Sequence, residues 1–183
     1  MKQLKFNAEM LRLVEAGLKT QTRRPLEPEP IGTADGDYCD PYNGEFGLFT
    51  FWTSDNKMRN DIFGNVIGTC HFRCPYGIPG DIVPIRGSKS KAKIKNVRVQ
   101  QLQEISEDDA MAEGVVRVTK DGKVFKYCVY DDGHDNSKTA WSEMPYSPIV
   151  TFKKLWNSIY AAKGFGWDEN PWVWVIEFEA VKP

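Results

Sequence analysis

The sequence predicts an α+β fold, with a mostly antiparallel sheet or small β-barrel and flanking helices. A helix near the N-terminus and a later one that begins at Pro148 both carry apolar residues at helical spacing. Between them, residues 115–130 have the pattern of a hairpin around an Asp-Gly turn. The last segment, PWVWVIEFEAV, is apolar on both faces from Trp172 to Ile176, which is typical of a central strand.

Size and charge favour a single domain without a general attraction to polyanions. The chain has 183 residues, and its 24 Lys and Arg nearly balance its 25 Asp and Glu, giving a net charge of −1. Any binding of nucleic acid must therefore come from a local basic patch. There is no 18-residue apolar run and no signal-peptide pattern, so we expect a cytoplasmic protein with no membrane partner. The 4 cysteines fit reduced thiols.

The segment GLKTQTRR, residues 17–24, concentrates reactive groups directly after the first helix. Asn7 is the predicted N-cap of that helix, its apolar stripe is Met10, Leu11, Val14 and Leu18, and Gly17 is the predicted end. From Lys19 the chain is expected to be extended. Lys19 then supplies a possible base for the Thr22 hydroxyl, and Arg24 a guanidinium for a carbonyl or phosphate oxygen. The alternative is a solvated turn.

A second short helix is bounded by Ser106, which forms a capping box with Asp109, and by Gly114. Glu113 lies at its C-terminal end, where the helix dipole disfavours an anion. If partly buried, this carboxyl would have a raised pKa and could donate a proton. Spacing alone favours the alternative, which is an exposed glutamate.

Several other patterns allow a functional and a structural interpretation. Lys89, Lys91, Lys93 and Lys95 alternate, so they either follow a phosphate backbone or protect an edge strand, and we favour the edge strand. The aromatic residues Phe46, Phe49, Phe51 and Trp52 either stack on bases or pack internally, and packing is favoured. Cys70, His71 and Cys74 have no second pair of ligands, and His134 lies in a polar loop. We expect no metal and no other cofactor.

Four segments in order resemble the ASCH domain family of the PUA-like superfold, in the version often carried by phages and prophages. These segments are GLKTQTRR, CPYGIPGD, VRVQQLQEISEDDAMAEGV, and FKKLWNSIY with NPWVWVIEFEAV. The resemblance covers roughly the first 25 residues, then about 73–116 and 148–181. It implies a small β-barrel with a cleft that meets RNA or a modified base, in one domain over 1–183 with variable insertions at about 26–72 and 117–147. A phage-encoded member would act in the host cytoplasm.

The resemblance also implies roles for individual residues. The small bacterial N(4)-acetylcytidine amidohydrolases carry a G-x-K-x-x-T-x-R motif and a glutamate after a short helix, and the matching positions here are Lys19, Thr22 and Glu113. Lys19 would be the base, Thr22 the nucleophile and Glu113 the proton donor. Gly17 and Arg24 complete the motif, and Arg23 and Arg86 are further expected ligand-binding residues.

The chain departs from larger members after PGD, where they typically have a Trp and an Arg-Glu pair. This chain has Pro84 and then Arg86-Gly87, followed by the short GSKSKAK run in place of a basic, aromatic stretch. The ligand is therefore expected to differ from theirs or to be smaller.

Three functions follow from these expectations. The first is binding of RNA, of a modified nucleoside or of single-stranded nucleic acid in a cleft lined by Lys19, Thr22, Arg24 and Glu113. The second is hydrolysis of N(4)-acetylcytidine or a similar acylated nucleoside. The third is a ribonuclease or a phage-host interaction protein. Binding is placed first because the three catalytic positions can persist after chemistry is lost.

Overall fold

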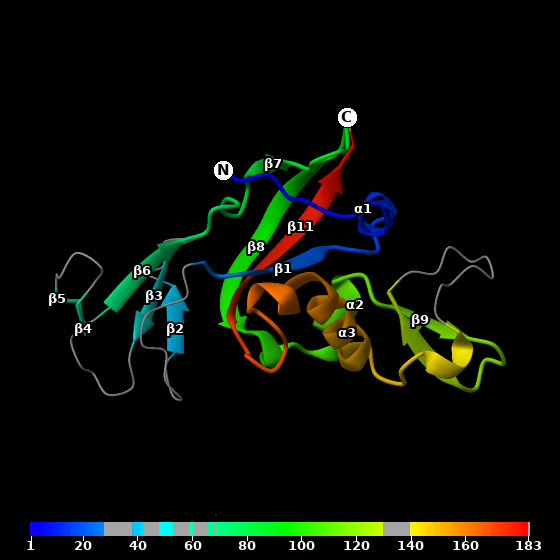
Figure 1. The fold of residues 1–183 in the computed structure, drawn as a ribbon. Coiled ribbons are helices and arrows are strands. Elements are labelled where there is room, and N and C mark those ends of the chain that lie inside the picture. Colours follow the sequence, from blue (N-terminus) through cyan, green and yellow to red (C-terminus); the bar gives the residue numbers. More distant parts are fainter. Residues whose placement is uncertain are drawn as a thin grey trace.

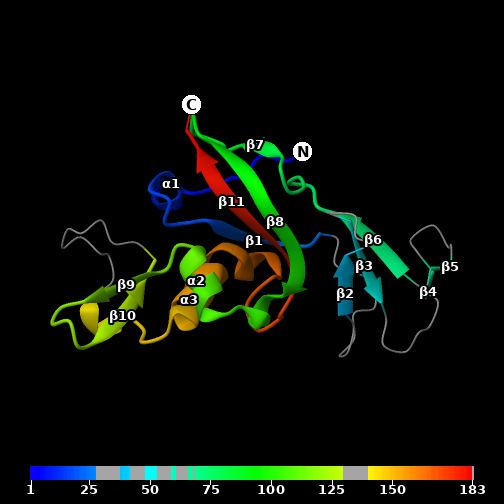
Figure 2. The same ribbon diagram turned by 180° about the vertical axis from the view of Figure 1, so that it is seen from behind.

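A curled antiparallel sheet organises the computed structural model, which describes residues 1–27, 38–41, 48–52, 59–60, 66–67, 69–129 and 140–182. The order of its strands is β1 (Gln21–Pro25), β11 (Trp172–Val181), β8 (Lys91–Gln101) and β7 (Ile82–Pro84). Every neighbouring pair is antiparallel. Figures 1 and 2 show β8 and β11 curving together over the helices. The predicted α+β class is confirmed.

The predicted barrel is found only as a half-barrel in the described part of the chain. No strand there joins β1 to β7; instead, the N-terminal segment lies between these two edges. Leu4 forms an isolated parallel bridge with Ile85, and the Arg24 guanidinium donates to the Lys5 carbonyl at 2.5 Å. Because one bridge is too short to be a strand, the sheet stays open along β1.

Two smaller sheets extend from opposite ends of this central unit (Figure 1). The hairpin of β9 (Val116–Thr119) and β10 (Phe125–Cys128) confirms the prediction from the Asp-Gly turn. The other sheet is β2 (Tyr38–Pro41), β3 (Leu48–Trp52) and β6 (Thr69–Arg73), with the short pair β4 (Arg59–Asn60) and β5 (Val66–Ile67) nearby. β3 pairs with β6 in an antiparallel register. The side chains of residues 46–52, Cys70, His71 and His134 lie outside the described residues.

The helices begin and end close to where the sequence predicts. The Asn7 side chain accepts a hydrogen bond from the Met10 amide and caps α1 (Ala8–Glu15), which Gly17 follows at φ +73°. Ser106 likewise caps α2 (Glu107–Ala112), and Ser147 caps α3 (Pro148–Tyr160). Short 3-10 helices are found at Leu102–Glu104, Trp141–Glu143 and Ala161–Lys163. One expectation was wrong: Leu18 is 53% exposed, because the helix ends before it, and Leu13 packs in its place.

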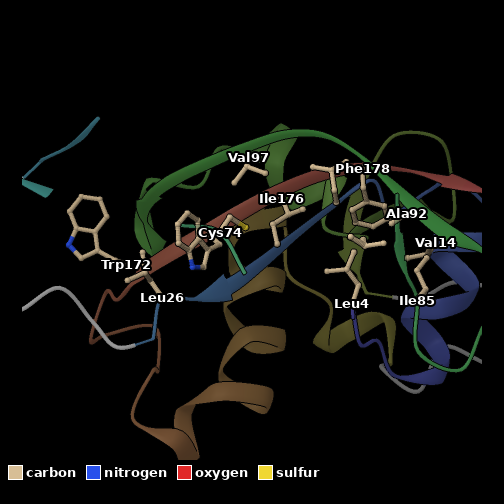
Figure 3. Packing of buried hydrophobic residues seen from close by; sticks show 13 residues of the cluster. Leu4, Val14, Leu26, Cys74, Ile85, Ala92, Val97, Trp172, Ile176 and Phe178 are labelled. Carbon is tan, nitrogen blue, oxygen red and sulfur yellow. The ribbon is translucent and has the colours of Figure 1, made fainter. Parts of the chain in front are cut away.

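The two faces of β11 carry the two parts of the hydrophobic core. Trp172, Trp174, Ile176 and Phe178 point to one face and pack with residues of the N-terminal segment, α1 and β8 (Figure 3). Val173 and Val175 point to the other face, where Phe152 and Trp156 of α3 cover them. Alternate residues of a strand face opposite sides, so an apolar run on both faces requires cover on both. The prediction of a central strand is confirmed.

The lysine-rich strand is covered on both sides over only part of its length. Lys91 and Lys93 of β8 pair with β11 on one side and with β7 on the other. Their side chains are nevertheless exposed and share one face with Lys95, which lies beyond the part of β8 that pairs with β7. Protection of an edge was therefore the wrong interpretation for Lys91 and Lys93, because the short β7, with Pro84, takes the edge position there.

Gly114 directly follows Glu113, the residue that ends α2. Its replacement by alanine is expected to destabilise the protein. Its φ of +98° is a left-handed conformation, and a Cβ there would lie 3.0 Å from Leu13 Cδ1. We expect Gly114→Ala to lose about 2–3 kcal/mol of unfolding free energy in urea titration, from backbone strain plus the contact. Gly122→Ala is the control, because its φ is +71° but its Cβ would meet nothing, so about 1 kcal/mol is expected. Equal losses would contradict a role for the contact.

Candidate functional site

The end of α1 and the end of α2 bring Lys19 to its place. After Gly17, the amides of Leu18 and Lys19 both donate to the Leu13 carbonyl, which turns the chain away from the helix. The Thr20 amide then donates to the Ala112 carbonyl at 2.9 Å. This backbone bond ties the start of β1 to the last turn of α2, so the residue before Thr20 lies beside the residue after Ala112.

Those two residues, Lys19 and Glu113, form a buried ion pair. Lys19 Nζ lies 2.7 Å from Glu113 Oε2 and donates a second bond to the Glu113 backbone carbonyl at 2.6 Å. Lys19 is 2% exposed and Glu113 is 3% exposed. The interpretation that spacing alone favoured, an exposed Glu113, is therefore wrong. The capping position of Glu113 directs its side chain inward, because Gly114 takes the left-handed turn at φ +98°.

A chain of charges continues from this pair to the surface. Arg23, also buried, donates from Nη1 to Glu113 Oε1 at 3.3 Å and from Nη2 to Asp109 Oδ2 at 2.8 Å. Arg98 binds the other Asp109 oxygen at 2.8 Å and pairs with Glu177. Burial opposes the charged form of Asp109, but the Arg23 charge and the Arg98 hydrogen bond outweigh it and lower its pKa. Asp109 therefore holds Arg23 against the Glu113 carboxylate.

The environment of Lys19 lowers its pKa. Burial is the largest cause and lowers the pKa of Lys19 below its usual 10.5, although the Glu113 charge and hydrogen bond act in the opposite direction. The charges of Arg24 and Arg23 lower it further. A lysine with a lowered pKa can serve as a general base near neutral pH, as a freely solvated lysine cannot.

Thr22 completes the group in a small cavity of about 30 Å³. Lys19, Thr22, Arg23, Arg24 and Glu113 are its polar lining. Apolar and aromatic residues of α3 and Met10 of α1 complete the lining. Thr22 is 3% exposed, and no hydrogen bond joins its hydroxyl to any side chain or backbone group in the described ranges. The cavity has room for roughly one or two water molecules, or for a group of a few heavy atoms.

Arg24 is fixed at the mouth of this cavity by three contacts. Nη1 donates to the Tyr160 hydroxyl at 2.9 Å, and Nη2 donates to the Lys5 carbonyl at 2.5 Å. The guanidinium also lies 5.5 Å from the centre of the Phe6 ring. Tyr160 belongs to α3, whereas Lys5 and Phe6 precede α1. Arg24 therefore links α3 to the N-terminal segment at the open edge of β1.

The structure brings together five of the seven residues expected at the site. Gly17 does not line the cavity, and its contribution is the turn that follows α1. Arg86 is exposed beyond β7 and lines neither this cavity nor the neighbouring groove. The reason is the open sheet, which leaves the β7 edge away from β1.

Sequence reasoning missed Asp109, Arg98 and Tyr160 as neighbours of the site. Asp109 was recognised only as a helix-capping residue, and its acidic neighbours Glu107 and Asp108 gave no reason to single it out. Tyr160 could be placed on the buried stripe of α3, but its hydroxyl contact with Arg24 depends on how the helix sits across the sheet. The alternation of Arg98 with Gln100 on a strand was the one available signal for a polar face.

The described residues offer no cluster of metal ligands and no helix long and apolar enough to cross a membrane. Cys74 is buried, and burial raises the pKa of its thiol to about 11, so it is an inert side chain rather than a reactive one. The side chains of Cys70 and His71, which were considered with Cys74 as a possible ligand group and not expected to bind metal, fall outside the described residues.

Comparison with protein-family models, with curated proteins and with solved structures gave no match. The function is therefore inferred from the residues around the cavity and from the resemblance of the sequence segments.

The Lys19–Glu113 pair is expected to show strong coupling in a double-mutant cycle. Removing one member leaves the other buried without its partner, so Lys19→Met and Glu113→Gln should each lose about 3–5 kcal/mol of unfolding free energy. The double variant should lose at least about 1 kcal/mol less than the sum. Urea unfolding followed by circular dichroism measures all four proteins. Additive losses would show that the two side chains do not interact in solution.

Proposed function

We propose that the chain is an amidohydrolase that removes an acyl group from an acylated nucleobase amine, such as that of N(4)-acetylcytidine. The observation that carries the proposal is the meeting of Lys19, Thr22 and Glu113 around one cavity, although Glu113 is 94 residues from Lys19 in the sequence. A buried lysine beside an unengaged threonine hydroxyl is the arrangement that activates a nucleophile. For this reason we place hydrolysis ahead of binding alone, reversing the order favoured by the sequence.

The first half of the reaction uses the Lys19–Glu113 pair as one acid–base unit. With its proton on Glu113, the pair is a neutral amine and a carboxylic acid. Lys19 takes the Thr22 proton while Thr22 Oγ attacks the acyl carbonyl carbon. The bond from that carbon to the base nitrogen then breaks, and Glu113 protonates the leaving amine. The products are the free base, an ester on Thr22 and the pair in its ionic form.

The second half restores the starting state. A water molecule attacks the ester carbon and gives its proton to Glu113. Thr22 Oγ leaves as the hydroxyl, taking its proton from Lys19. The acid is released, and the pair is again a neutral amine and a carboxylic acid, so all protons balance over one turnover.

Arg23 is suited to stabilise the negative oxygen that forms in each step. Its Nε–H is buried and has no hydrogen-bond partner among the described residues, although both terminal nitrogens are engaged by carboxylates. A donor held in place before the reaction is the arrangement that stabilises an oxyanion most effectively. The small cavity limits what enters it to the acyl group, so the base itself must stay outside.

We further propose a PUA-like ASCH fold for the chain. The curled antiparallel sheet, its helices and the place of GLKTQTRR on the open edge of the sheet support this. The β2–β3–β6 sheet coincides with the expected insertion at about 26–72 except for the last residue of β6, and the β9–β10 hairpin overlaps the one at 117–147.

Binding of RNA or of a modified nucleoside without turnover is the second candidate. The observation in its favour is that both Glu113 oxygens accept hydrogen bonds from cations, Lys19 and Arg23. That is the geometry of an ionised carboxylate rather than of an acid ready to donate. In this case Thr22 only lines the pocket, and affinity survives its loss.

Thr22→Ala is expected to abolish release of acetate from N(4)-acetylcytidine, because it removes the proposed nucleophile. We expect a fall in kcat of at least about a thousandfold, measured by liquid chromatography of cytidine and acetate. Thr20→Ala is the matched control, since Thr20 is two residues away on the same segment but exposed, and it should keep its activity.

A panel of acylated cytidines, adenosines and guanosines extends the assay beyond the acetyl group. If the wild-type protein cleaves none of them, hydrolysis of acylated nucleobases is wrong and binding alone is left.

The pH dependence of kcat/KM is expected to be bell-shaped, because the active pair holds one proton. Activity should fall at high pH as the Lys19–Glu113 pair loses its shared proton, with an apparent pKa below 10.5 because burial lowers the pKa of Lys19. Glu113→Gln cannot hold the shared proton, so its residual activity should instead rise with pH as Lys19 becomes neutral. A Glu113→Gln profile of the wild-type shape would contradict the shared-proton mechanism.

A further inference from the structure

A larger groove adjoins the small cavity along the open edge of β1. Its volume is about 580 Å³, within the range of roughly 300–1,000 Å³ that is usual for small-molecule sites. The N-terminal segment, β1, the Pro75–Tyr76 turn and the end of α3 contribute its walls. Unlike the cavity, it is large enough for a nucleoside with a phosphate.

The groove is strongly cationic for a chain whose net charge is −1. Four cations line it, Lys2, Lys5, Arg24 and Lys163, against the single carboxylate of Glu27. No ion pair joins Lys2, Lys5 or Lys163 to a carboxylate of the described residues. Lys163 lies over the Tyr160 ring, 5.2 Å from its centre. Positive charges that line one groove without carboxylates to neutralise them mark a site for an anion.

The groove and the cavity share two residues, Arg24 and Tyr160. Because the Arg24 guanidinium is held by the Tyr160 hydroxyl and the Lys5 carbonyl, it forms a fixed wall between the two spaces. These bonds use two of the five guanidinium N–H groups, and no other hydrogen bond of the guanidinium is found within the described ranges. An anion in the groove would therefore lie next to the group that enters the cavity.

The groove also has one accessible aromatic surface. Tyr76, Tyr160 and Trp174 line it, but Trp174 is buried, and Tyr160 packs against Trp156 and lies under Lys163. Tyr76 is half-buried, so it can offer its ring for a base to stack on, and the cations beside it suit an ester of phosphate. Among anions, this combination suits a nucleotide better than an acidic peptide, whose carboxylates would find the cations but would leave the Tyr76 ring without a planar partner.

We propose that this groove is a phosphate subsite, so that the ligand is a nucleotide whose base projects its acyl group into the cavity, rather than a free nucleoside. The inference rests on the proposed function for the acyl group, but the phosphate contact is independent of turnover. A nucleotide within a strand and a free mononucleotide share this chemistry.

The test measures binding to the full chain carrying Thr22→Ala, so that no probe is consumed. Isothermal titration compares N(4)-acetylcytidine with its 5′- and 3′-monophosphates, and fluorescence anisotropy follows labelled pentacytidylates of RNA and DNA. We expect a phosphate to lower Kd by about tenfold or more at low salt. A pentamer that binds more tightly than either monophosphate indicates a strand as the source, and equal affinity indicates the mononucleotide; both outcomes support the subsite.

Variants that lack two positive charges test whether the gain in affinity from a phosphate, here called the phosphate gain, arises in the groove. Lys5→Gln with Lys163→Gln should reduce the phosphate gain to about twofold or less, because two of the four cations are lost. Lys120→Gln with Lys123→Gln makes the same charge change on the turn between β9 and β10, a hairpin at one end of the molecule in Figure 1 and outside the groove, and should keep the gain. A gain that survives in the groove variant, the absence of any gain, or binding of none of these probes overturns the proposal.

Acetate release by the wild-type protein is measured in a separate experiment, so that turnover and phosphate binding are judged independently. A phosphate gain without turnover contradicts the hydrolase and keeps the subsite. Turnover of the nucleoside with no phosphate gain keeps the hydrolase and contradicts the subsite.

Discussion

The buried ion pair of Lys19 and Glu113 is the interaction on which the site depends. It joins the chain after α1 to the chain after α2, and the backbone bond from Thr20 to Ala112 holds the same two segments together. Removing two charges from water costs several kcal/mol for each ion, and their attraction offsets this only when further hydrogen bonds satisfy them. Here the Glu113 carbonyl and Arg23 supply those bonds. A pair so costly to bury is poor evidence for stability and better evidence for function.

The pair also explains why the neighbouring residues are polar where a core would be apolar. Arg23 and Gln21 of β1 are both buried beside helices whose other contacts are hydrophobic. Arg23 balances the second Glu113 oxygen, and Asp109 with Arg98 carries the charge outward to solvent. The unpartnered Arg23 Nε–H and Gln21 amide nitrogen are costs that packing alone would not retain. The proposed oxyanion contact gives the Arg23 donor a use.

In the proposed function, the small cavity and the groove along β1 recognise different parts of the ligand. The small cavity selects by size, since only a group of a few atoms fits beside Thr22. The groove selects by charge and by aromatic surface, and Arg24 belongs to both. Both depend on the half-barrel staying open along β1, because a strand paired there would cover the edge.

The sequence by itself determined the local elements and the reactive residues. Helices begin at the capping residues Asn7, Ser106 and Ser147, and two of them end just before Gly17 and Gly114. The apolar pattern of β11 predicts a central strand. These signals can be recognised in the sequence because caps, turns and periodicity act over a few residues. The combination of Lys19 with Thr22 was likewise visible from their spacing. Only the tertiary structure decided that Glu113 is buried beside Lys19, that Asp109 and Tyr160 join the site, and that Arg86 does not. Those outcomes depend on how α2, α3 and the N-terminal segment pack around β1, and contacts between residues about 90 or more apart leave no pattern in a single sequence.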